Sequence, residues 1–194
     1  LRDLVNSTKL PFWMSETGSG GSGLNGNLSL AERMFSDLNV MKPQAWIDWQ
    51  FVEEGNDQWC MVQGDFASQW YKVVKNCYVR MQVTRFIKQG YTLLESPDEH
   101  ILAALNPEGT ELVIVALNNT DEETRFVMDL SLFSSLGSQA IRYLTNDSRN
   151  CEKLSSIYTT ADKQLPCLLP KRSIATYILP VTAGEGISGI HPER

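Results

Sequence analysis

The 194-residue chain lacks several features that define broad classes of protein. No apolar run approaches the roughly 20 residues of a membrane-spanning helix, so we expect no membrane span. Basic residues do not predominate, and the net charge of −6 argues against a nucleic-acid surface, which usually carries a basic patch. No apolar segment of a signal peptide follows Leu1-Arg2-Asp3. The first residue can therefore follow a cleaved signal, an artificial truncation or an upstream domain.

Cysteine and histidine are also scarce. The four cysteines, Cys60, Cys77, Cys151 and Cys167, form no C-x-x-C pair, and the two histidines lie far in sequence from any cysteine cluster. No zinc site with a recognisable motif is expected, and we expect no metal and no cofactor. Cys151 and Cys167 are candidates to bridge a loop in an oxidising compartment, whereas Cys77 lies on an apolar helical face, as small core residues do.

The most informative stretch is Pro11–Gly18, in which apolar residues lead up to one carboxylate and a glycine-rich loop, residues 19–23, follows. A short apolar run is typical of a buried parallel strand, so Phe12–Met14 is predicted as the end of such a strand. Glu16 is then the residue exposed at its C-terminal tip. In a (β/α) barrel that tip carries catalytic groups. The alternative for a lone glutamate is an ordinary solvated acid at the end of a strand.

Up to about residue 90, helical and extended patterns alternate. The predicted elements are, in order, a helical tail over residues 1–9, the strand that ends at Glu16, a helix over 28–38, a strand over 45–51, a polar loop over 52–69 and a helix over 77–87. Ser29 is the predicted N-cap of the second helix, with Glu32 completing a capping box. This order predicts a pair of parallel βα units.

After residue 90 the pattern changes to short runs of β-branched and aromatic residues that turn formers separate. The predicted strands span residues 100–105, 111–118, 125–130, 140–144 and 173–179. The Asn106-Pro107-Glu108-Gly109 turn is the clearest hairpin signal. We expect an antiparallel sandwich over residues 91–182, distinct from residues 1–90, and a flexible tail over residues 183–194.

Three stretches, in the same order, resemble glycoside hydrolase family 30. Pro11–Gly18 resembles the seventh strand of that family, where an apolar-Ser-Glu run carries the catalytic nucleophile. Ala45–Gln50 resembles its eighth strand, and Asn76–Gly90 resembles its final helix, although Arg85 stands where the family often has Lys. The resemblance covers about residues 8 to 180. It implies the C-terminal part of a (β/α)8 TIM barrel followed by an antiparallel β-sandwich.

The resemblance further implies a retaining glycoside hydrolase that cleaves β-glycosidic bonds of a polysaccharide, with Glu16 as the nucleophile. Such enzymes need a second carboxyl group about 5–5.5 Å away as acid/base. In the family this group is a Glu in an Asn-Glu dipeptide on strand four, and no Glu in this chain follows an Asn. We therefore expect the acid/base in a missing N-terminal barrel segment of the same protein, and we expect the chain alone to be inactive.

Substrate-binding residues are expected on the eighth strand, because aromatic rings stack on the apolar C–H faces of sugars. Trp49 matches the second Trp of the family's strand and is the candidate floor of the −1 subsite, with a packing role in the barrel wall as the alternative. Trp46 and Asp48 are further candidates, but a period of two places them on the face opposite Trp49 unless the strand end bulges.

The Ser-Glu-Thr-Gly-Ser-Gly-Gly stretch resembles that of an endo-β-1,6-galactanase or a related β-1,6-glycanase, which favours these enzymes. Within the family, β-glucosidase and xylan-cleaving enzymes are the alternatives.

The competing hypothesis is a non-catalytic carbohydrate-binding β-sandwich module with a barrel remnant. Such a module would expose coplanar aromatic residues over 91–180, a region without any Trp, whereas all five Trp precede it. This distribution favours the enzyme. The enzyme is expected to be secreted or periplasmic and to act on a carbohydrate substrate.

Overall fold

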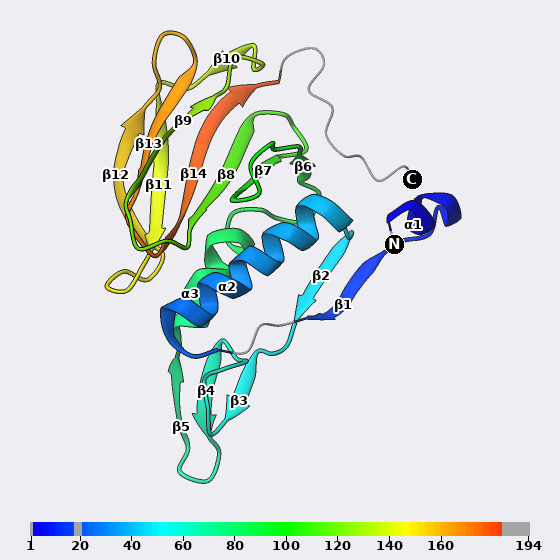
Figure 1. Ribbon diagram of the computed structural model, residues 1–194, viewed down its shortest axis with the longest axis vertical. Helices are drawn as coiled ribbons and strands as arrows, with labels where there is room; N and C mark the ends of the chain where they lie inside the picture. Colours follow the sequence, from blue (N-terminus) through cyan, green and yellow to red (C-terminus); the bar gives the residue numbers. More distant parts are fainter. Residues whose placement is uncertain (1, 18–20, 184–194) are drawn as a thin grey trace.

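The computed structural model describes residues 2–17 and 21–183 (Figure 1). Two helices, α2 (Gly23–Ser36) and α3 (Lys75–Thr84), lie across the middle of the molecule. On one side they face a large antiparallel sheet, and on the other side lie the parallel strands β1 (Trp13–Thr17) and β2 (Ala45–Asp48). The fold is rich in sheet and has few helices.

β1, α2 and β2 form a parallel strand–helix–strand unit, as predicted. The helix begins at Gly23, whereas its apolar spacing predicted a start at residue 28. The prediction missed the first turn because its sequence, Gly-Leu-Asn-Gly, is poor in helix-forming residues. The capping-box prediction was wrong. Ser29 lies inside α2, where its hydroxyl donates to the Asn25 carbonyl oxygen 3.3 Å away. The remaining elements here are α1 (Arg2–Thr8) and the π-helical turn η1 (Asp37–Met41) that continues α2.

A small three-stranded sheet occupies the stretch that was predicted as a polar loop. β3 (Val52–Glu54) pairs parallel with β4 (Val62–Asp65), and β4 pairs antiparallel with β5 (Trp70–Val73). The loop prediction was wrong because each strand has only three or four residues, too few for alternation to stand out from the polar residues between them. This sheet projects beyond the C-terminal ends of β1 and β2 (Figure 1).

The second half of the chain forms a seven-stranded sheet and a two-stranded sheet. The strands are β6 (Thr92–Leu94), β7 (Ile101–Leu105), β8 (Glu111–Asn118), β9 (Thr124–Asp129), β10 (Ser135–Leu136), β11 (Gln139–Thr145), β12 (Glu152–Tyr158), β13 (Gln164–Leu169) and β14 (Ser173–Thr182). The large sheet has the order β12-β11-β14-β8-β7-β6, with β10 paired to β14, while β13 pairs with β9. The five predicted strands are found. β12 was missed because it is largely polar, and β13 because Pro166 interrupts it.

The predicted hairpin between β7 and β8 is confirmed. The two strands pair antiparallel, with Leu105 opposite Leu112. Asn106 Oδ1 accepts hydrogen bonds from the N–H groups of Thr110 and Glu111 at 2.7 and 2.8 Å, which closes the turn.

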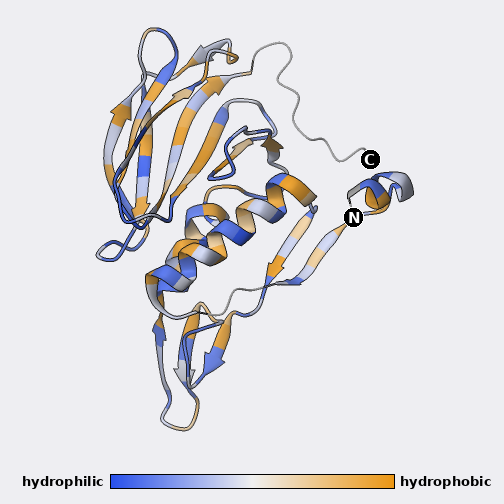
Figure 2. Ribbon diagram, in the orientation of Figure 1, coloured by the Kyte–Doolittle hydropathy of each residue, from blue (hydrophilic) through white to orange (hydrophobic). Residues whose placement is uncertain are grey.

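Apolar cores lie on both faces of the large sheet, and Figure 2 shows apolar residues along its strands and along α2. One core, between this sheet and the two-stranded sheet of β9 and β13, contains Tyr177 and Cys167. The other, beneath α2 and α3, contains Phe35 and Cys151. A bridge between Cys151 and Cys167 is therefore ruled out, because the sheet separates them, and all four cysteines are free thiols.

A buried polar network joins α3 to the large sheet. Gln82 of α3 and the strand residues Thr145 and Thr176 are each fully buried. The Thr176 hydroxyl lies 2.6 Å from both the main-chain and the side-chain carbonyl oxygen of Gln82. The Gln82 amide in turn donates to the Thr145 hydroxyl oxygen at 2.8 Å. These bonds fix the position of α3 on the sheet.

Replacing Thr176 with Val is expected to lower the free energy of unfolding by about 1–3 kcal/mol, because the buried Gln82 carbonyl oxygens lose their donor. Thr124→Val, at an exposed position of β9, is the matched control and should change the free energy of unfolding by less than about 0.5 kcal/mol. Urea unfolding of the intact protein measures both. Equal midpoints for the two variants would show that the network does not hold α3.

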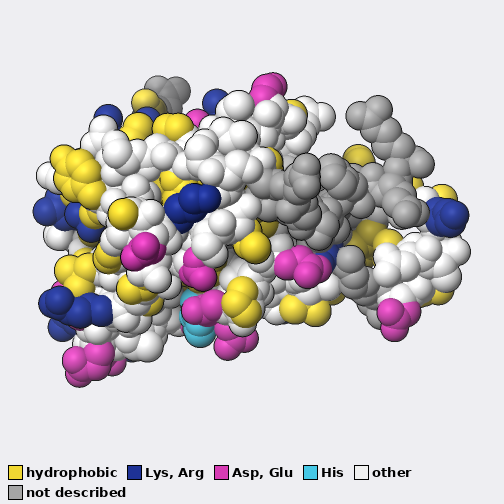
Figure 3. All heavy atoms as spheres, turned by 90° about the horizontal axis from the view of Figure 1, so that it is seen from above, with side chains coloured by type: hydrophobic (Ala, Val, Ile, Leu, Met, Phe, Trp, Pro, Cys, Tyr) yellow, Lys and Arg dark blue, Asp and Glu magenta, His cyan; other side chains and the backbone are white. Residues whose placement is uncertain are grey.

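Charged side chains of both signs are interspersed over the face seen in Figure 3. Within residues 2–17 and 21–183, no helix has the length and apolar character needed to cross a bilayer. The predicted flexible tail lies outside the described residues from residue 184 onward.

Candidate active site

An irregularity in β1 decides which way Glu16 points. Met14 lies opposite Trp46 in the parallel pairing. Two residues further along β2, Asp48 lies opposite Thr17 rather than Glu16, so β1 contains one extra residue. Regular alternation would place Glu16 on the same face as Met14. The bulge instead turns Glu16 to the opposite face, where it is exposed.

Trp46 and Asp48 face the helices. Trp46 Nε1 donates to Asp37 Oδ2 of η1 at 3.0 Å. Asp48 forms an ion pair with Arg80 of α3, and only 7% and 5% of these two side chains are exposed. Burial lowers the pKa of the Arg80 guanidinium to about 10, which leaves it charged at pH 7. Both side chains thus have their partners in the helix layer and share one face of β2, as period-two alternation predicted.

Glu16 and Trp49 lie close to the C-terminal ends of neighbouring strands. The Trp49 N–H donates to the carbonyl oxygen of Thr17 at 2.9 Å, so Trp49 lies next to the last residue of the strand that contains Glu16. Trp49 is 49% exposed, and Trp13, further back on β1, is also exposed. An exposed carboxylate and an exposed indole therefore stand at the same end of the strand pair.

Gly21 and Ser22, which precede α2, are bonded to the segment between β3 and β4 of the small sheet that follows β2. The Gly21 N–H donates to the Gln58 carbonyl oxygen at 3.3 Å, and the Ser22 hydroxyl donates to Asp57 Oδ1 at 2.5 Å. The peptide bond between Trp49 and Gln50 is cis. Gly21 and Ser22 are thus joined directly to residues 57–58, beyond the end of β2.

The polar groups next to the Glu16 carboxylate in the sequence are only partly described. Gly18–Gly20 lie outside the described residues, while Ser15 and Thr17 flank Glu16 in β1. Among the residues that the structure describes, none donates a hydrogen bond to this carboxylate. Over residues 2–17 and 21–183, no group of three or more His, Cys, Asp or Glu side chains is arranged so that it could hold a metal ion.

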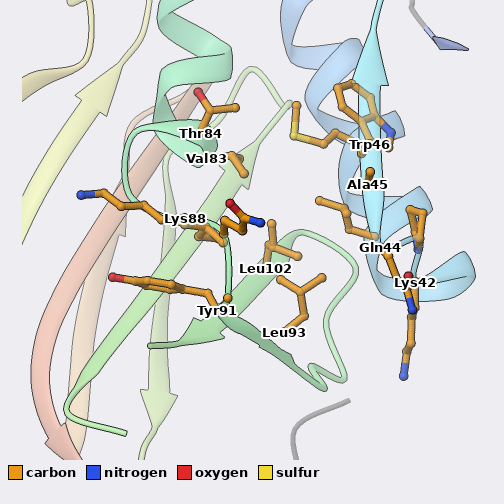
Figure 4. Close-up of a pocket in the computed structure, with 16 residues that line it drawn as sticks. Lys42, Gln44, Ala45, Trp46, Val83, Thr84, Lys88, Tyr91, Leu93 and Leu102 are labelled. Atoms are coloured by element: carbon orange, nitrogen blue, oxygen red, sulfur yellow. The ribbon is translucent and has the colours of Figure 1, made fainter. Parts of the chain in front are cut away.

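A cavity of about 680 Å³ lies at the other end of β2 (Figure 4). One wall consists of Lys42 and Gln44 together with Ala45 and Trp46 of β2. The opposite wall is formed by α3, the segment after it and the edge of the large sheet, with Val83, Thr84, Lys88, Tyr91, Leu93 and Leu102. The cavity is largely apolar and lies apart from Glu16, so it is not the cleft around the candidate nucleophile.

No family model matches the sequence. The chain is 29% identical over 140 residues to an endo-β-1,6-galactanase of Hypocrea rufa, an alignment that covers 71% of this chain and 28% of that protein. Its fold is similar to that of a glycoside hydrolase family 30 subfamily 8 xylanase from Clostridium acetobutylicum, with a TM-score of 0.73, 20% identity and coverage of 92% of this chain and 44% of the xylanase. A family 30 endoxylanase from Clostridium papyrosolvens gives a TM-score of 0.71 with 20% identity and coverage of 91% and 44%.

The chain thus spans less than half the length of the proteins that it matches. These comparisons confirm the resemblance to a C-terminal portion of family 30 enzymes that three short stretches of sequence predicted.

Proposed function

We propose that this chain, similar in fold to part of family 30 glycoside hydrolases, is the C-terminal part of a retaining β-glycoside hydrolase. In this proposal β1 and β2 are the last two strands of a (β/α)8 barrel, and residues 91–182 are the β-sandwich that follows it. The observation that carries the proposal is the bulge in β1, which turns Glu16 to the exposed face at the strand end beside Trp49. That strand end is where barrel enzymes hold their catalytic groups.

The rest of the barrel is assigned to a segment of the same protein that precedes residue 1. Two strands cannot close a barrel, which takes eight. Two features support this assignment. Exposed Trp13 and Ile47 lie on the face of the strand pair that α2 and α3 do not cover, and the 680 Å³ cavity opens beside the first residues of β2. The uncovered face would pack against the other barrel strands, and the cavity leaves room for further side chains of that segment. The same segment supplies the acid/base.

The chemistry assigned to Glu16 proceeds in two displacements. First, its carboxylate attacks the anomeric carbon while the acid/base protonates the departing glycosidic oxygen, which leaves a glycosyl ester on Glu16. Next, the acid/base takes a proton from water, and the water oxygen displaces Glu16 from the anomeric carbon. Because each displacement inverts that carbon, the product keeps the configuration of the substrate.

Trp49 is the residue that we assign to substrate binding. Its exposed indole stands beside the strand of Glu16, where the C–H face of a sugar can stack on it. The substrate-binding roles predicted for Trp46 and Asp48 remain predictions. We prefer to assign these two residues to positioning, since their side chains bind Asp37 and Arg80 in the helix layer.

The preferred substrate is a β-1,6-linked galactan or a related β-1,6-glycan. The galactanase of Hypocrea rufa, at 29% identity, supports this choice over a β-glucoside. A xylan is the alternative, because the two similar proteins from Clostridium are xylanases.

Covalent trapping tests the nucleophile directly. Incubating the intact protein with an activated 2-deoxy-2-fluoro-β-galactoside should slow the second displacement, so that a fluorogalactosyl ester accumulates on Glu16. Peptide mapping by mass spectrometry should place the added mass on the peptide that contains residues 13–17. A label on another carboxylate would contradict the assignment of Glu16, and the same reagent with a fluoroxyloside tests the alternative substrate.

A further inference from the structure

Exposed aromatic side chains gather on the small β3–β4–β5 sheet and just before it. In this part of the chain they are Trp49, Phe51, Phe66, Trp70 and Tyr71. Phe66 and Tyr71 are the most exposed of the five, at 66% and 79%. Isolated exposed aromatic residues are ordinary, but two exposed rings on the same face of a small sheet indicate a binding surface.

The register of the sheet places part of this cluster on one face. Tyr71 of β5 and Glu54 of β3 both lie opposite Gly64 of β4. The Phe66 ring lies over the same glycine, 3.7 Å from the point where a Cβ would stand. Glu54, Gly64, Phe66 and Tyr71 therefore share a face, called the Tyr71 face below. Trp70 pairs with the next residue of β4 and so lies on the opposite face.

The glutamate on this face is held in place by the backbone. The Phe66 N–H donates to Glu54 Oε1 at 3.1 Å. The carboxylate is thereby fixed next to two aromatic rings, and it can still accept hydrogen bonds from hydroxyl groups of a ligand. Rings that stack on C–H faces, together with a carboxylate that binds hydroxyls, form a surface suited to a sugar chain.

The charge of the sheet restricts the kind of sugar. Of the four acidic side chains of residues 51–73, Glu54 lies on the Tyr71 face. Asp57 lies between β3 and β4, and Glu53 and Asp65 lie on the opposite face together with the single basic side chain, Lys72. Like charges repel, so a polymer with uronic acid groups or phosphates is disfavoured here. A neutral polysaccharide meets no such repulsion.

The Tyr71 face belongs to a sheet that is continuous with the candidate active site. The Gln50 N–H donates to the Trp59 carbonyl oxygen at 2.5 Å, and Met61 N–H donates to that of Phe51 at 3.1 Å, which ties the sheet to the end of β2. Together with the bonds from Gly21 and Ser22, these contacts hold the sheet beside the strand ends that carry Glu16 and Trp49.

We propose that the Tyr71 face binds a neutral polysaccharide chain at a distance from the bond that is cleaved. This inference rests on the proposed function and deepens it: long neutral substrates gain affinity from this face, whereas short ones do not reach it. Linear β-1,6-galactan is the probe that represents such a chain.

Binding of this galactan to the intact protein tests the proposal, with Glu16→Gln in the background to prevent turnover. The double change Phe66→Ala and Tyr71→Ala is expected to raise Kd at least about tenfold, as loss of central aromatic contacts does. Tyr71→Ala alone should raise Kd severalfold. Because the Tyr71 side chain is highly exposed, this single change should not unfold the protein, so the weaker binding cannot be attributed to unfolding. Trp70→Ala on the opposite face and Tyr158→Ala on the large sheet are matched controls, and each should leave Kd within about twofold.

Three results would overturn the proposal: an unchanged Kd in both Tyr71 variants, an equal loss in Trp70→Ala, or binding of an acidic glucuronoxylan as tight as that of the galactan. Turnover of a small aryl β-galactoside, measured with Glu16 present, tests the proposed hydrolase activity separately from polysaccharide binding by the Tyr71 face. The Tyr71 variants should retain that turnover. Its absence from the unmodified protein would count against the proposed function, while the galactan Kd values still decide the role of the Tyr71 face.

Discussion

Glu16→Gln in the intact protein is expected to lower kcat on β-1,6-galactan by at least about a thousandfold. The amide has nearly the same shape as the carboxylate, but it cannot attack the anomeric carbon to form the ester intermediate. Glu16 is exposed, so this change should leave the unfolding midpoint unaltered. Initial rates from the release of reducing ends measure the effect.

Glu99→Gln provides the matched control, because Glu99 is also exposed but lies in the loop before β7. Its kcat should stay within about twofold of that of the unmodified protein. Added azide should also restore turnover in Glu16→Ala and yield a glycosyl azide of inverted configuration, since only one displacement then takes place. A kcat within tenfold of normal for Glu16→Gln would remove Glu16 from the mechanism.

The position of Glu16 at a strand end could be predicted from the sequence, but its orientation could not. An apolar run followed by one carboxylate and a glycine-rich loop is visible in a single segment. A bulge exists only relative to a partner strand, and here it consists in Asp48 lying opposite Thr17 rather than Glu16. Without it, the same alternation that places Trp46 and Asp48 on one face of β2 would have turned Glu16 toward the helices.

The small sheet shows a second limit of sequence patterns. Its strands hold three or four residues each, and they are stabilised by bonds to segments far away, such as those from Gly21 and Ser22 to residues 57–58. Local alternation over so few residues cannot be told from a loop. By contrast, β8 spans eight residues and has neighbours on both faces, so its long apolar run marked it clearly.

Breaking the Asp48–Arg80 ion pair is expected to have the largest effect on stability. Arg80→Met should lower the free energy of unfolding by about 3–5 kcal/mol, because it leaves the Asp48 carboxylate buried without its counter-charge. Within the described residues, Asp48 Oδ1 has no hydrogen-bond partner that could offset the loss. Urea unfolding of the intact protein measures the change. Arg125→Met, which breaks an exposed pair with Glu123, should cost less than about 1 kcal/mol.

The double variant Asp48→Leu and Arg80→Met separates packing from positioning. Removing both charges leaves no unpaired ion, so stability should return to within about 1 kcal/mol of the original, which would demonstrate the coupling. Equal destabilisation in the single and double variants would exclude this coupling.

Because Asp48 directly precedes Trp49, an apolar contact in place of the ion pair should hold the indole less firmly. We therefore expect kcat/KM on galactan to stay about tenfold below normal in the stable double variant. A fully restored kcat/KM would instead assign the pair to the packing of α3 alone, without any part in the alignment of the strand end.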